Sequence, residues 1–327
     1  MQANVGNRRE YCTIHNDVRP LSYGIVLLVL GGCAVSSEPP IPGFDGADYW
    51  DSGLVYHQHI DVATMRAELF SPELMLSGFI SAVAASANDL YFIDQGTGQL
   101  VQVDLATKTG KVLAALQSPT GPGLFADIDG KVFAIDRARR RLLVIDSHLA
   151  DTRYLPLGPM LGNALDIAVT GQGRWLLVLD GLQGTIAMLD SFGGVLQVMR
   201  PDSSSSMPFV TPRAMAATEQ GFLVLDGGAD QVVAFDAYGR TVGVLADEDL
   251  SRATALAADS CGRLFIADSE GLYLGFSDMN FPGHRASIPE LEGRDISDLS
   301  SDGAFLFVAT RADGIHMLLI DPVCGEQ

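Results

Sequence analysis

Two closely spaced histidines and the four cysteines are the residues of this sequence that we consider first as possible metal ligands. His57 and His59 are separated by one residue, so in a β-strand both would point to one face, as a pair of metal ligands requires. No third ligand can be identified near them, and the cysteines form no Cys-x-x-Cys motif. We therefore predict no metal site and interpret the two histidines as part of a solvated edge strand.

The sequence also lacks the common catalytic motifs. It contains no Gly-x-Ser-x-Gly, no His-Glu-x-x-His and no phosphate-binding glycine-rich loop. One basic cluster, Arg137 and Arg139 to Arg141, could bind an acidic partner or lipid head groups, but a solvated turn is the simpler interpretation. We predict no catalytic and no cofactor-binding residue, which favours a binding protein over an enzyme.

The elements that must position these residues form a repeat. Six apolar runs each end in a turn-forming residue, and these closing residues are Asp94, Asp136, Asp180, Asp226, Asp268 and Thr310. They lie 42, 44, 46, 42 and 42 residues apart, a spacing typical of propeller blades. The apolar runs have almost no polar position, as expected for strands covered on both faces. The sequence thus predicts an all-β fold, a six-bladed β-propeller of four-stranded blades.

The sixth repeat is predicted to be one strand short. Its strands are expected near 295–300, 304–310 and 315–320, which leaves no sequence for a fourth. The β-rich run 54–62 precedes the first repeat and is predicted to complete this last blade, because such a closure protects the edges of the sheet. We expect a tether at 33–53 and a propeller at 54–327, with repeats from about 79 to 321.

The repeats resemble a known family. An apolar run ending in Leu-Asp, a turn and then the segment Val232–Asp236 is similar to the NHL repeat and to TolB-like six-bladed propellers. The resemblance implies a scaffold that binds a protein, a peptide or a glycan. Polar residues on the inner strands would line the axial channel of such a fold, and the candidates are Asp166, Arg213 and Asp298.

An enzyme is the alternative. Six-bladed propellers of the SMP-30 and paraoxonase kind are metal-dependent lactonases that hold calcium in the axial channel. Asn163 stands before an inner strand, where a ligand of that kind could lie. The inner strands are otherwise mostly apolar, whereas calcium needs six or more oxygen ligands. We therefore expect no metal in the channel, and the lactonase or hydrolase remains the second hypothesis.

Two cysteines are candidates for a disulfide. Cys261 and Cys324 are predicted to lie in adjacent blades on one face of the propeller. In an oxidising compartment they would either form a disulfide or remain free thiols, because the sequence does not give their Cα separation.

The amino-terminal residues predict a lipid anchor. The apolar run 23–32 is too short to span a membrane and suits the core of a signal peptide. It ends in Leu-Gly-Gly-Cys at 30–33, which resembles the bacterial lipobox and implies diacylglycerol and palmitate on Cys33. The leader, 1–32, is unusually long, so we expect the true start at Val18. Ala34 implies an outer-membrane anchor that faces the periplasm of a Gram-negative bacterium.

The charge of the chain excludes one class of partner. Forty acidic residues against 21 basic ones give a net charge of -19, which repels a phosphate backbone. We expect no nucleic acid partner. The expected partner is an envelope protein or peptide.

Overall fold

The computed structural model describes residues 54–61, 76–86, 89–105, 109–117, 119, 121–127, 129–146, 151–170, 175–200, 209–246, 248–268, 271–276 and 284–320. All of them belong to one compact unit, Ala47–Gln327. The predicted leader, the tether up to residue 53, Val18 and Cys33 lie outside the described residues. No helix in the described part of the chain has the length and apolar character needed to cross a membrane.

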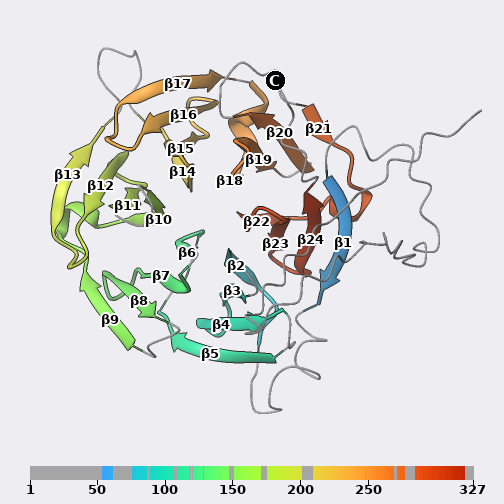
Figure 1. The fold of residues 1–327 in the computed structure, drawn as a ribbon, viewed down its shortest axis with the longest axis horizontal. Helices are drawn as coiled ribbons and strands as arrows, with labels where there is room; N and C mark the ends of the chain where they lie inside the picture. Colours follow the sequence, from blue (N-terminus) through green and yellow to red (C-terminus); the bar gives the residue numbers. More distant parts are fainter. Residues whose placement is uncertain are drawn as a thin grey trace, which may run out of the picture. The chain divides into compact units, whose positions relative to one another are not determined.

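The described strands form six antiparallel four-stranded sheets, arranged as blades around a central axis (Figure 1). Blade one holds β2 (Ile80–Ser86), β3 (Asp89–Asp94), β4 (Gln99–Asp104) and β5 (Thr109–Ala115). Blade two holds β6 (Leu124–Ala126), β7 (Lys131–Asp136), β8 (Arg141–Asp146) and β9 (Asp151–Pro156). Blade three holds β10 (Ala164–Thr170), β11 (Trp175–Asp180), β12 (Thr185–Leu189) and β13 (Val195–Met199).

The remaining blades continue the same order from the axis outward. Blade four holds β14 (Pro212–Ala217), β15 (Gly221–Asp226), β16 (Gln231–Asp236) and β17 (Thr241–Ala246). Blade five holds β18 (Ala255–Ala258), β19 (Arg263–Asp268), β20 (Gly271–Phe276) and β21 (His284–Ala286). Blade six holds β22 (Ile296–Ser301), β23 (Phe305–Thr310), β24 (Gly314–Ile320) and β1 (Leu54–Ile60). The predicted six-bladed propeller is confirmed.

The burial of the strands explains why the repeats read as continuous apolar runs. All six residues of β15 are buried, because blades three and five cover its two faces. The outermost strands lack this cover, and most residues of β9 and β13 are exposed. The hydrophobic core is therefore divided into clusters that lie between successive blades.

The aspartates that close the apolar runs have a structural role, as predicted. The carboxylate of Asp226 accepts N–H bonds from Val210 at 2.7 Å, from Thr211 at 2.7 Å and from Gly228 at 3.2 Å. The first two donors precede the inner strand of the blade and the third lies in the turn after Asp226. One buried carboxylate thus fixes the turn and the entry to the inner strand.

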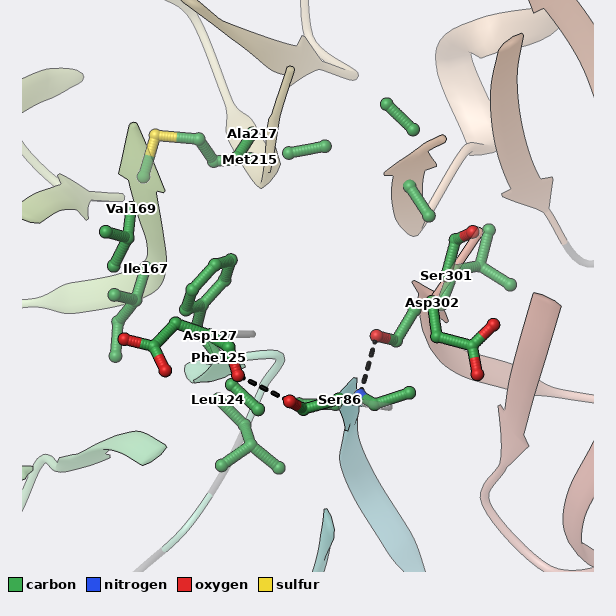
Figure 2. Close-up of a pocket in the computed structure, with 18 of the residues that line it drawn as sticks. Ser86, Leu124, Phe125, Asp127, Ile167, Val169, Met215, Ala217, Ser301 and Asp302 are labelled. Atoms are coloured by element: carbon green, nitrogen blue, oxygen red, sulfur yellow. Dashed lines mark hydrogen bonds between the residues drawn. The ribbon is translucent and has the colours of Figure 1, made fainter. Parts of the chain in front are cut away.

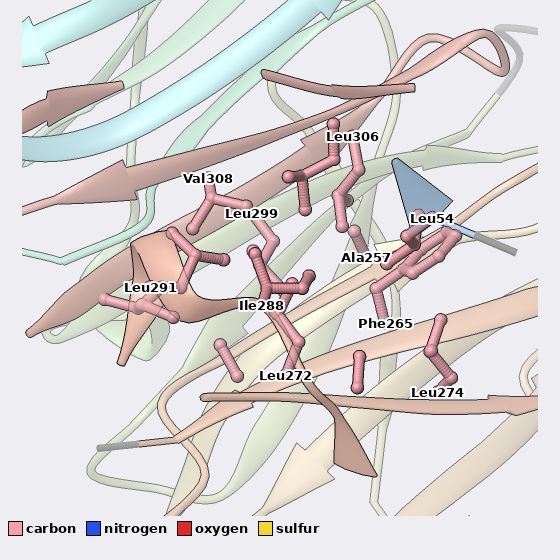
Figure 3. Packing of buried hydrophobic residues seen from close by; sticks show 14 of the residues in the cluster. Leu54, Ala257, Phe265, Leu272, Leu274, Ile288, Leu291, Leu299, Leu306 and Val308 are labelled. Atoms are coloured by element: carbon pink, nitrogen blue, oxygen red, sulfur yellow. The ribbon is translucent and has the colours of Figure 1, made fainter. Parts of the chain in front are cut away.

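Ring closure by the amino-terminal strand is confirmed. Strand β1 pairs antiparallel with β24, so the two ends of the propeller lie in one sheet (Figure 1). Leu54, at the start of β1, is 1% exposed and packs among residues of blades five and six, near Phe265 and Leu274 (Figure 3). The observed strand ends at Ile60, two residues before the predicted limit.

Candidate functional site

An axial cavity of about 700 Å³ lies where the inner strands converge (Figure 2). Residues of β2, β6, β10, β14, β18 and β22 line it, so every blade contributes. The volume is within the range of small-ligand sites, about 300 to 1,000 Å³. Most of its wall is apolar, and Phe125, Ile167 and Met215 are among the lining residues.

Two buried aspartates form the inner end of the cavity. Asp166 and Asp298 stand near the starts of β10 and β22, in blades three and six, and both are 4% exposed. Asp166 accepts the N–H groups of Ile167 at 2.8 Å and of Met215 in the next blade at 2.6 Å. Asp298 likewise accepts the N–H of Leu299, and that of a residue in blade one, each at 2.9 Å. Each carboxylate therefore links two neighbouring blades.

Burial makes the ionised forms of these two carboxyl groups costly. It raises the pKa of Asp166 to about 7, against the opposing effect of the two N–H donors and Arg137. Burial also raises the pKa of Asp298 well above its usual value, and the negative charge of Asp166 raises it further. The two groups therefore repel each other when both are ionised. A cation that reached this end of the cavity would relieve that repulsion.

The mouth of the cavity carries further carboxylates. It is formed by the turns that follow the inner strands, and the acidic residues there are Asp127, Asp129, Glu219, Asp259 and Asp302. Asp259 is neutralised by Arg263, whose Nε lies 2.5 Å from its Oδ2. Asp127 and Asp302 each use Oδ1 to accept two N–H groups of their own turn.

The arrangement selects ligands by charge. Seven carboxyl groups line the cavity, and no Lys or Arg is found among its described lining residues. Because burial disfavours ionisation of the two inner groups and Arg263 neutralises Asp259, the negative charge lies mainly at the mouth. Anions are therefore repelled, whereas a cation on an apolar stem would place its stem on the wall and its charge near a carboxylate. The mouth residues were not predicted from the sequence, because acidic residues in turns are common and their convergence on one axis becomes visible only in the fold.

The described channel residues do not fit calcium. Asp166 and Asp298 already accept two backbone N–H groups each, and the equivalent positions on other inner strands include Ala82, Ala214 and Ala255. Calcium takes six to eight oxygen ligands, which these side chains do not supply. Asn163, the other candidate, is exposed and is not among the residues that line the cavity.

The arginines occupy structural positions. Arg213 is not among the residues that line the cavity, and its Nη1 donates to the Ala253 carbonyl at 2.7 Å. In the basic cluster, Arg139 and Arg141 pair with Asp136 at 2.9 and 3.0 Å. The cluster is therefore tied to the closing residue of its own blade and is only partly a solvated turn.

The two histidines of β1 do not share a face. The register between β1 and β24 shifts between Tyr56 and Gln58, so His57 lies at a β-bulge. The His57 ring contacts Phe305 at 5.3 Å between centroids, while His59 stacks on His316 at 4.6 Å. The prediction that both side chains point to one face is therefore wrong, because the bulge adds one residue between the strand partners. His59 instead lies with two residues that the sequence did not identify, His316 and Asp313.

The cysteines can be placed in part. Cys261 lies in the turn between the first two strands of blade five and is disulfide-bonded. Cys324 lies outside the described residues, so the pairing of Cys261 with Cys324 stays a prediction.

Known proteins resemble this chain in fold. No protein-family model and no curated protein matches the sequence. Virginiamycin B lyase from Staphylococcus aureus has a TM-score of 0.59 at 9% identity, over 74% of this chain and 94% of the lyase. A gluconolactonase from Xanthomonas campestris has a TM-score of 0.56 at 16% identity, over 82% of this chain and 95% of that protein. At these identities the similarity establishes the fold alone.

Proposed function

We propose that this chain is a lipid-anchored envelope protein whose propeller binds a basic peptide segment of a partner protein. One lysine or arginine side chain of the partner enters the axial cavity. The observation that carries the proposal is the composition of that cavity, which combines an apolar wall with carboxylates at its mouth and no lining cation among the described residues. A lysine side chain has the matching parts, an apolar stem and a terminal charge.

The proposal can be tested with two short peptides of opposite charge. Fluorescein-labelled trilysine is expected to increase in fluorescence anisotropy on titration with the full chain, whereas labelled triglutamate is not. Binding of trilysine should weaken as salt is raised, because four of the five mouth carboxylates are at least partly exposed to solvent. Equal binding of the two peptides would refute the proposal.

A matched pair of double variants separates the cavity from the general negative charge. The variant Asp127→Asn with Asp302→Asn removes two mouth charges while leaving Oδ1 to accept the turn N–H groups. It should weaken trilysine binding about tenfold, the equivalent of two exposed ion pairs. The control, Asp190→Asn with Asp236→Asn, changes turns of the same type that are not among the cavity-lining residues. Equal weakening by the control would contradict a cavity site.

The anchor is the second part of the proposal. The Leu-Gly-Gly-Cys sequence at 30–33 supports lipidation at Cys33, and Ala34 supports retention at the outer membrane on its periplasmic side. Labelled palmitate fed to the producing bacterium is expected to enter the parent chain and the Cys324→Ser variant, but not Cys33→Ser. Palmitate in Cys33→Ser, or none in the parent chain, would contradict the anchor.

A metal-dependent lactonase is the alternative function, favoured by the fold shared with a gluconolactonase. The two hypotheses differ in their response to calcium. For the binding protein, calcium chloride should leave the melting temperature unchanged, because the described channel residues do not form a calcium site. Stabilisation by calcium together with turnover of a lactone would replace the binding hypothesis with the enzyme.

A further inference from the structure

A second polar cluster lies away from the axial cavity, at the seam where β1 closes the ring. It consists of His59 from β1, Asp313 from the turn between β23 and β24, and His316 from β24. One ligand atom of each side chain lies within 4.8 Å of the others. We propose that these three residues bind a divalent transition-metal ion of the zinc class, and that the ion holds the two ends of the propeller together.

The state of His316 points to a missing ligand. Its side chain is 3% exposed, and Nε2 has no hydrogen-bond partner. A buried polar nitrogen without a partner costs free energy, so such an atom calls for an explanation. The other ring nitrogen, Nδ1, lies 3.3 Å from the hydroxyl of Tyr56. A metal ligand often has this pattern, in which a hydrogen bond to one nitrogen orients the ring and leaves the other for the ion.

The distances suit a tetrahedral ion. His316 Nε2 and Asp313 Oδ2 are 3.4 Å apart. Zinc bonds of roughly 2.0–2.2 Å place two tetrahedral ligands about 3.4 Å from each other. The third ligand, His59, must approach further. Its ring is partly exposed and stacks on that of His316, and its Nε2 is hydrogen-bonded to the Asp313 carbonyl. The ring must therefore either give up this hydrogen bond or offer Nδ1 to the ion, and its partial exposure lets it rotate without disturbing the hydrophobic core. Two imidazoles and one carboxylate leave a fourth position for water.

One cation competes for this cluster. Arg294 Nη1 lies 2.7 Å from Asp313 Oδ2, although the geometry of this ion pair leaves the oxygen without a hydrogen bond. The arginine side chain is 45% exposed, so the pair is weak and the side chain can move into solvent. Zinc binding therefore displaces Arg294, and removing the arginine should tighten binding.

The test is zinc binding to the full chain after treatment with a chelator. Zinc chloride is titrated against a chromogenic chelator, with cobalt chloride as a spectroscopic probe of tetrahedral coordination. The parent chain should bind one zinc ion and should melt at a higher temperature when zinc is present. Removing a residue that only orients a metal ligand lowers metal affinity by about 10- to 100-fold. His59 is proposed as a ligand itself, so His59→Ala should lower the zinc affinity by more than about 100-fold.

Three variants make the test specific. His57→Ala is the matched control, because His57 lies on the opposite face of β1, and it should bind zinc like the parent. Arg294→Gln should bind more tightly than the parent. Asp313→Asn removes the charge of the carboxylate but keeps the size of the side chain, and it should weaken zinc binding. The proposal is overturned if the parent binds no stoichiometric zinc, or if His59→Ala binds as well as His57→Ala.

Discussion

Replacing Leu54 by alanine tests how β1 holds the ring closed. Leu54 is 1% exposed and packs against side chains of blades five and six, among them Phe265 and Leu274 (Figure 3). Exposing a leucine side chain costs about 1.5 to 3 kcal/mol, and a cavity left in a rigid core raises the total cost of Leu→Ala to about 2 to 5 kcal/mol. Blade five cannot move in to fill the space left by the shorter side chain without losing its own contacts. We therefore expect the free energy of unfolding to fall by about 3 kcal/mol.

The assay is equilibrium urea unfolding of the full chain, followed by circular dichroism in the parent and the variant. The matched control is Leu319→Ala, which removes the same atoms from a residue of the same sheet that is 40% exposed. A surface change of this kind alters the free energy of unfolding by no more than about 0.5 kcal/mol. If Leu54→Ala costs no more than the control, Leu54 is not buried between the last two blades and the closure is wrong.

Three further predictions concern the described core and turns. The raised pKa of Asp166, about 7 against roughly 3.9 in an unfolded chain, means that folding takes up a proton between these values. The contribution of Asp166 to stability is therefore complete below about pH 4 and is lost as the pH rises through about 7. Asp166→Asn should flatten this slope in urea unfolding measured across that range. An unchanged slope would contradict burial of the carboxyl group. Asp226→Ala leaves three N–H groups without their acceptor and should cost about 3 kcal/mol in a thermal melt, and a change below about 1 kcal/mol would show that the carboxylate is dispensable. Gly314→Ala should lower the melting temperature, because Gly314 has a φ of +95° and an added Cβ would meet the Ile60 carbonyl. The control is Gly293→Ala, at a residue that also has a positive φ but has open space around it. Equal shifts in the two variants would contradict close packing of β24 against β1.

The sequence predicted the repeat because the repeat is local. Each apolar run is covered by neighbouring blades, so its burial is visible in the residues themselves, as in β15, where every residue is buried. The closing aspartates were predicted for a similar reason, since the side chain of Asp226 bonds to the turn that directly follows it. The missing outer strand of the sixth repeat followed from counting strands.

The candidate sites depend on contacts that are distant in the sequence. His59 and Asp313 are 254 residues apart, and only the pairing of β1 with β24 brings them together. A β-bulge, which the sequence did not indicate, then separated His57 from His59. Asp166 and Asp298 were recognised as polar residues on inner strands, but the N–H bonds that tie each of them to the next blade require the ring to be closed.

The most direct test of the proposed function observes the ligand inside the cavity. Methionine methyl groups labelled with carbon-13 give a signal for Met215, which lines the axial cavity (Figure 2), and for Met188, which is buried between blades. The signals can be assigned with Met215→Leu and Met188→Leu. We predict that trilysine shifts the Met215 resonance and leaves that of Met188 in place. A peptide that binds without shifting Met215, or that shifts only other methionines, would contradict a binding site in the axial cavity.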